Sequence, residues 1–180
     1  MKKNKNSKNP KFQLSSLMNK YDEYLKQRKE KTEKERSEQK INTEAFLKIR
    51  NEIIRPIFEK IKDEMERRGH KVWIETDEPS WNFDKNIPID PSITFKLELI
   101  TNVKRQSHYH DTPEIPYLSF VYSSLEKEVY RHKSTIGPGQ IGYSGPGKKF
   151  RQGKITRKVV KEEMLIWLES LISDVAPACF

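Results

Sequence analysis

Glycine and lysine are concentrated in one stretch of this chain, residues 137–153, which holds six of its seven glycines. Glycine lets backbone N–H groups come close to a ligand and adopt positive φ. The surrounding window, residues 127–161, carries ten Lys and Arg against one acidic residue, Glu128. Tyr143 and Phe150 add rings on which bases can stack. The stretch therefore predicts a flexible loop that contacts phosphates or nucleic acid, and the competing interpretation is a solvated loop whose glycines only make turns.

The predicted nucleic-acid-binding side chains are ten basic and aromatic residues from this window. They are Arg131, Lys133, Tyr143, Lys148, Lys149, Phe150, Arg151, Lys154, Arg157 and Lys158.

Residues 142–149 come close to the phosphate-binding pattern GxxxxGK[ST] of nucleotide hydrolases. Lys149 stands where a hydroxyl would hold magnesium, and Gly153 and Thr156 place the start of the next helix too late. No alternating series of strands and helices builds the parallel sheet of that class. We therefore reject a nucleotide hydrolase.

Two further groups could carry chemistry. His108, His110 and Asp111 offer metal-ligand side chains, but no second motif lies at a diagnostic spacing. Lys96 and Glu98 lie on one strand face, in the reverse of the usual carboxylate-x-lysine order of metal-dependent nucleases. We predict no enzyme activity, no cofactor and no metal, and keep a metal-dependent hydrolase as a distant alternative.

The elements that position these residues indicate an α+β fold. Apolar residues recur every three or four positions between Asn42 and Gly69, which predicts a helix kinked or split at Pro56. The period then changes to two, with strands expected at 71–76, 93–100, 117–123 and 127–135 and a loop at 77–92. A last helix follows Thr156. We expect about four antiparallel strands, covered on one face by an N-terminal and a C-terminal helix.

Residues 1–40 differ in composition from the rest, with 13 basic and 6 acidic residues. Residues 1–13 have a composition typical of disorder. The next segment has an apolar stripe at helical spacing, a predicted partner-binding element made of Leu14, Leu17, Met18, Tyr21 and Leu25. Residues 26–40 have no apolar side chain and predict a solvated, helical spacer. The expected organisation is an extension at 1–40, a folded domain at 41–176 and a tail at 177–180.

The composition of the chain limits the classes of protein to which it can belong. Hydrophobic and charged residues each make up 34% of the chain, and the net charge is +9. No run reaches the roughly 18 apolar residues of a membrane span, Cys179 is the only cysteine, and the N-terminus has no apolar secretory core. We therefore expect a cytoplasmic protein without a membrane partner.

Two functions follow from these features. The first is a nucleic-acid-associated accessory protein that binds nucleic acid or another polyanion. The alternative is an adaptor that docks on a protein partner through residues 14–25.

Overall fold

The computed structural model describes residues 10–82, 87–100, 115–136 and 144–175. The chain divides into two compact units, Met1–Ile41 and Asn42–Phe180. Helix α1 (Pro10–Ile49) forms the described part of the first unit and the first turns of the second. Residues 1–9 and the tail at 177–180 lie outside the described residues.

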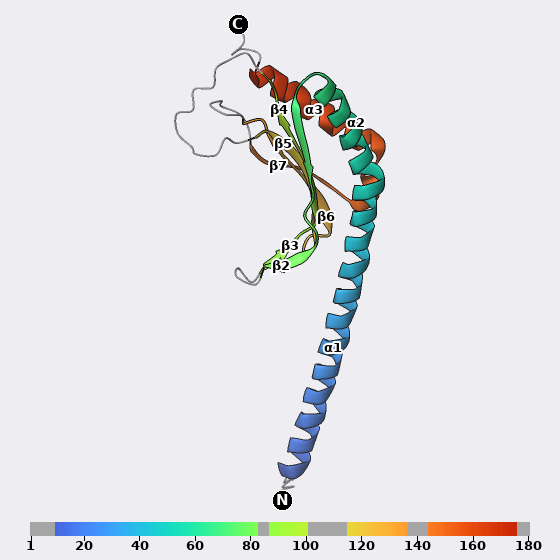
Figure 1. The fold of residues 1–180 in the computed structure, drawn as a ribbon. Coiled ribbons are helices and arrows are strands. Elements are labelled where there is room, and N and C mark those ends of the chain that lie inside the picture. Colours follow the sequence, from blue (N-terminus) through green and yellow to red (C-terminus); the bar gives the residue numbers. More distant parts are fainter. Residues whose placement is uncertain (1–9, 83–86, 101–114, 137–143, 176–180) are drawn as a thin grey trace, which may run out of the picture. The chain divides into compact units, whose positions relative to one another are not determined.

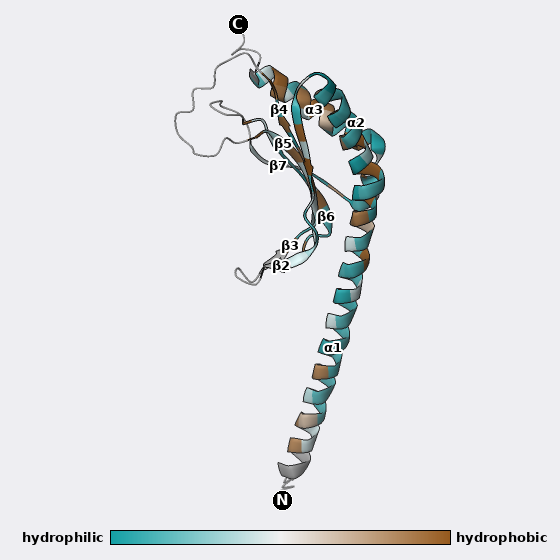
Figure 2. Ribbon diagram, viewed as in Figure 1, coloured by the Kyte–Doolittle hydropathy of each residue, from teal (hydrophilic) through white to brown (hydrophobic). Residues whose placement is uncertain are grey.

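Helix α1 is longer than the sequence pattern predicts, because the helix expected at 14–25, the spacer and the start of the next helix form one element. The spacer consists largely of lysine, glutamate, arginine and glutamine, which favour helix, and it contains neither glycine nor proline. Its side chains are almost all exposed. Figure 2 shows α1 as largely hydrophilic with isolated hydrophobic positions.

Pro56 acts on the helix as predicted, though without ending it. A π-helical turn, η1 (Arg50–Ile54), comes directly before α2 (Arg55–Arg67), and Arg55 N–H donates to the carbonyl of Arg50. Pro56 is the second residue of α2 and has no N–H to donate to the turn before it, so the hydrogen-bond pattern is interrupted next to the π-helical turn. Helix α2 ends at Arg67, Gly69 follows with a φ of +88° that suits glycine, and His70 N–H donates to the carbonyl of Met65 at 3.0 Å.

The second unit contains an antiparallel five-stranded sheet in the order β1-β4-β5-β6-β7 (Figure 1). Its strands are β1 (Lys71–Glu75), β4 (Ser92–Glu98), β5 (Tyr117–Ser123), β6 (Glu128–Ser134) and β7 (Ser144–Phe150). Two short strands, β2 (Ser80–Asn82) and β3 (Ile87–Ile89), pair in a separate hairpin. The 3₁₀-helix η2 (Gln152–Lys154) and helix α3 (Arg157–Val175) follow β7.

The predicted α+β class, the antiparallel sheet and the N-terminal and C-terminal helices are confirmed, but the estimate of about four strands is wrong. The fifth strand, β7, comes from the glycine-rich stretch, which the sequence predicts as loop. The β2–β3 hairpin comes from the predicted loop at 77–92. Neither shows an alternating apolar pattern, because β7 is an edge strand and β2 and β3 are three residues each.

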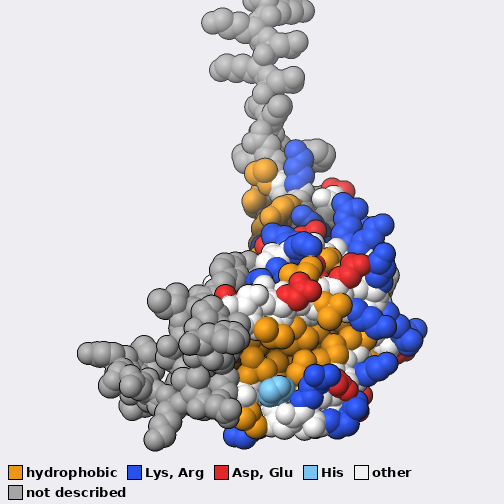
Figure 3. All heavy atoms as spheres, turned by 90° about the horizontal axis from the view of Figure 1, so that it is seen from above, with side chains coloured by type: hydrophobic (Ala, Val, Ile, Leu, Met, Phe, Trp, Pro, Cys, Tyr) orange, Lys and Arg blue, Asp and Glu red, His pale blue; other side chains and the backbone are white. Residues whose placement is uncertain are grey.

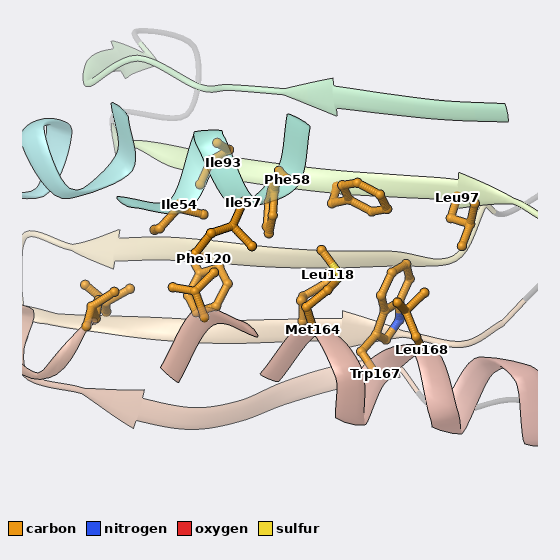
Figure 4. Packing of buried hydrophobic residues seen from close by; sticks show 14 of the residues in the cluster. Ile54, Ile57, Phe58, Ile93, Leu97, Leu118, Phe120, Met164, Trp167 and Leu168 are labelled. Carbon is orange, nitrogen blue, oxygen red and sulfur yellow. The ribbon is translucent and has the colours of Figure 1, made fainter. Parts of the chain in front are cut away.

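Helices α2 and α3 pack on the same face of the sheet, where the core lies. Alternate residues of β4 and β5 point to this face, among them Ile93, Phe95 and Leu118, all with 0% exposure. Trp167 of α3 lies edge-on to Phe95, and its indole N–H donates to the carbonyl of Ser134 at 3.0 Å. Figure 4 shows Ile57 and Phe58 from α2 and Met164 and Trp167 from α3 gathered over the strands.

Candidate functional site

The glycine-rich stretch is in large part structured. Its residues Ser144–Phe150 form β7, which pairs with β6 along an irregular register that shifts between Tyr130 and His132. Pro146 sits opposite His132 on this outermost strand, where a missing N–H costs no sheet hydrogen bond on the solvent side. Residues 137–143, which include Tyr143 and the glycines Gly137, Gly139 and Gly142, lie outside the described residues.

Arg131, a predicted nucleic-acid contact, is buried. It lies on the helix-covered face of β6 with 7% exposure, and its guanidinium forms an ion pair with Glu163 of α3, which is 3% exposed. Gly147 of β7 passes directly over the guanidinium, since a Cβ there would lie 2.4 Å from Nη2 of Arg131. This glycine therefore serves close packing, and Arg131 does not contribute to an exposed surface.

Lys148 completes the same charge cluster from the solvent side. Its Nζ lies 2.9 Å from Oε1 of Glu163, while Arg131 binds Oε2. One buried carboxylate thus ties strands β6 and β7 to helix α3. The Lys148 side chain stays 62% exposed and shares the carboxylate of Glu163 with Arg131, so the cluster of three side chains keeps one positive charge.

Lys149 points to the opposite face of the sheet and is also paired. Its Nζ lies 2.7 Å from Oε2 of Glu126 and 4.8 Å from the centre of the Tyr130 ring. Glu126 raises the pKa of Lys149, and Lys149 lowers the pKa of Glu126. Glu126 also raises the pKa of the Tyr130 hydroxyl.

The other two predicted contacts in this part of the sheet, Phe150 and Lys133, are each partly buried. Phe150 pairs with Val129 and packs half-buried against the core, so its ring has limited area for a base. Lys133 pairs with Leu118 in β5 and is of intermediate exposure.

Four predicted contacts follow β7 within eight residues of one another in the sequence. Arg151, Lys154, Arg157 and Lys158 are all exposed, and we call them the basic surface. Residues 151–161 contain no acidic residue. Within the described residues, the one ion pair of this group joins Lys158 to Glu162, at 3.8 Å.

The start of α3 lies inside the basic surface. Thr156 caps the helix as predicted, because its hydroxyl accepts a hydrogen bond from Val159 N–H at 3.3 Å. Arg157 and Lys158 occupy the first turn, which holds no acidic residue. Cations at a helix N-terminus oppose the helix dipole and so carry a small cost for folding. Their placement favours a bound anion, which would interact with both the dipole and the side chains.

The alternative hydrolase residues receive no support as a cluster. His108, His110 and Asp111 lie outside the described residues, as does Cys179. Within the described residues no group of three or more His, Cys, Asp and Glu side chains is placed to hold a metal ion. Lys96 pairs across strands with Glu75 at 2.5 Å, and Glu98 with Lys71 at 3.5 Å, so both serve the sheet.

Besides Glu163, sequence reasoning missed a second buried charged residue, Arg50. It is 5% exposed, lies 2.7 Å from Oε1 of Glu78, and donates to the carbonyl of Asp77 at 3.1 Å. The signal was present in the spacing, because Arg50 falls four residues after Phe46 and four before Ile54, both fully buried. These bonds join η1 to the segment after β1.

The predicted partner-binding stripe on α1 is exposed. Leu14, Leu17, Met18 and Tyr21 are 50–63% exposed, with Tyr24 beside them at 57%, while Leu25 is partly covered. Among the described helices none is long and apolar enough to cross a membrane.

Comparison of the chain with family models, curated proteins and solved structures finds no match. The assignment of a function therefore depends on the side chains described above.

Proposed function

We propose that this protein binds nucleic acid or another polyanion, without catalysis, through the basic surface formed by Arg151, Lys154, Arg157 and Lys158. The observation that carries the proposal is a contrast between neighbouring cations. Arg131 and Lys148 share the carboxylate of Glu163 and Lys149 pairs with Glu126, whereas among the cations that follow β7 only Lys158 has an acidic partner within the described residues.

The charge density of this surface supports a polyanionic ligand. The four cations of the basic surface lie within residues 151–158, which hold no acidic residue, and repel one another in the free protein. A chain of phosphates would relieve this repulsion and would release its condensed counterions on binding. A single small anion would relieve only part of it.

The geometry favours contacts with the backbone of a nucleic acid over contacts with its bases. Long, exposed lysine and arginine side chains reach phosphates readily, and such contacts carry no sequence information. Phe150 is packed against the core, so base stacking is not the basis of this proposal. We expect similar affinity for unrelated sequences of equal length.

The test is fluorescence anisotropy with labelled oligonucleotides at several salt concentrations. The variant K154A/R157A/K158A should weaken binding to every sequence and reduce the slope of log affinity against log salt by up to about three. The control K48A/K60A/R67A removes the same number of charges from other exposed helical positions and should change both quantities far less.

Two results would contradict the proposal. The first is no binding of duplex or single strands by the intact protein at low salt. The second is an equal loss in both triple variants, which would assign the effect to net charge. Binding that survives the first triple variant and vanishes on deletion of residues 1–13 would move the site to the lysine-rich N-terminus.

A second candidate function is docking on a protein partner through α1, favoured by the exposed stripe of Leu14, Leu17, Met18 and Tyr21. Such side chains seldom form a contiguous exposed row on a helix without a partner. The variant L17S/Y21S/L25S should abolish complex formation with a purified partner while leaving oligonucleotide binding intact. Unchanged recovery of the complex would contradict docking.

A further inference from the structure

The outward side of α3 carries apolar residues as well as the inward side. Val160, Met164 and Trp167 are buried against the sheet, yet Leu165 is 57% exposed and Ile172 is 53% exposed. A helix that covers a core normally exposes a polar face, and a helix that is apolar on all sides is normally covered on all sides. The outer side of α3 therefore lacks a partner within the described residues.

Apolar side chains outside α3 are exposed as well. Ile100, which follows β4, is 58% exposed, and Ile61 and Met65 of α2 are partly buried at the edge of the core. Figure 3 shows hydrophobic side chains gathered on the face seen there, next to a histidine and bordered by lysine, arginine and some acidic side chains. Exposed areas of this kind mark interaction sites in soluble proteins.

Charge along α3 is divided between its ends. Arg157, Lys158 and Lys161 lie in the first turns together with one exposed acidic residue, Glu162, and Glu169 and Asp174 lie toward the C-terminus, so the exposed charges sum to a positive first half and a negative second half. Two copies of α3 packed antiparallel would bring the basic end of each against the acidic end of the other. Parallel packing would bring like charges together. The helix is thus complementary to a second copy of itself in one orientation.

The spacing places apolar and charged positions in one stripe. Lys161, Leu165, Glu169 and Ile172 follow one another at intervals of four, four and three residues, and so share a face about 80° wide. Lys161 and Glu169 lie symmetrically about Leu165, each about 6 Å along the axis. An axis of two-fold symmetry at Leu165 would set Lys161 of each copy opposite Glu169 of the other.

From this arrangement we propose that the protein forms a symmetric dimer through α3, packed antiparallel against α3 of a second copy, with Leu165 at the two-fold axis. Leu165 forms the centre of the interface, Ile172 lies about 10 Å from the axis on the same face, and two symmetric pairs of Lys161 with Glu169 fix the orientation. Lys158 of the basic surface shares this face, whereas Arg151 and Lys154 precede α3 and Arg157 lies off the face, so three of the four cations of the basic surface stay outside the interface.

Sedimentation velocity and equilibrium of the full chain over a range of concentrations test the dimer. The intact protein should approach 42.8 kDa, twice its 21.4 kDa chain mass, and L165E should sediment as a monomer. The matched control is I166E, one residue further, 42% exposed and outside the stripe, which should keep the dimer. Thermal unfolding of both variants confirms that they are folded.

Charge exchange tests the orientation. K161E and E169K alone should each raise the dissociation constant of the dimer roughly tenfold, since each places like charges opposite one another. The double variant K161E/E169K restores the opposite charges and should recover most of the loss. An intact protein that stays monomeric at high concentration, or a dimer unaffected by L165E, overturns the proposal. Additive losses in the double variant overturn the antiparallel arrangement.

Discussion

The cluster of Arg131, Glu163 and Lys148 makes a sharp prediction about stability. Glu163 is 3% exposed and is the carboxylate that balances the buried guanidinium of Arg131. Glu163→Gln preserves shape and keeps an oxygen acceptor but removes the negative charge. The buried Arg131 is then left without a counter-charge, in a place where water cannot replace it.

The magnitude follows from the burial of both partners. Removing one partner of a buried ion pair costs about 3–5 kcal/mol, out of a total stability of about 5–15 kcal/mol for a typical domain. At about 3 °C per kcal/mol for a protein of this size, Tm should fall by about 10–15 °C. Lys148 adds little to this figure because its side chain is 62% exposed and remains hydrated.

Urea and thermal unfolding of three variants measure the effect. The matched control is Glu162→Gln, the same change one residue earlier at an exposed position 3.8 Å from Lys158, which should cost about 0.5 kcal/mol or less. The double variant R131M/E163L replaces the pair by apolar side chains and should recover most of the stability. Glu163→Gln within about 1 kcal/mol of the intact protein, or a double variant no more stable than the single one, would refute the reasoning.

Three further predictions concern other parts of the chain. Gly147→Ala should destabilise the protein by about 1–3 kcal/mol in urea unfolding, because its Cβ would lie 2.4 Å from a guanidinium that Glu163 holds in place; an unchanged midpoint would show that Arg131 can move aside. Burial lowers the pKa of His132, so the unfolded chain binds more protons in acid, and stability should fall as pH drops below about 6.5; this part of the pH dependence should be absent in His132→Gln, and identical profiles would argue against it. Deletion of residues 1–40 should leave the Tm of the second unit nearly unchanged, because side chains 14–40 are almost all exposed; a large drop in a calorimetric scan would mean that they contribute to its stability.

Residue type and spacing were sufficient to predict the elements that have strong local signals. Alternation in Ile93–Leu99 and Tyr117–Ser123 predicted β4 and β5, and Gly69 and Thr156 marked one helix end and one helix start. Strand alternation and helix ends depend on residues only a few positions apart, so they can be recognised in the sequence itself. The charge of residues 151–161 is likewise a local property, and the structure leaves most of these side chains exposed.

Tertiary structure decided which of the basic side chains are exposed to solvent and which are buried. Arg131 and Arg151 look alike in sequence, but the register of β6 turns Arg131 inward toward Glu163, 32 residues away along the chain. The same packing requires glycine at position 147, which the sequence pattern assigns to a flexible loop. Strand β7 exists because β6 offers it a hydrogen-bonding edge, not because its own residues favour a strand. Contacts between distant segments carry no local signature, and for that reason the sequence predicted the α+β class but did not reveal that Arg131 is buried.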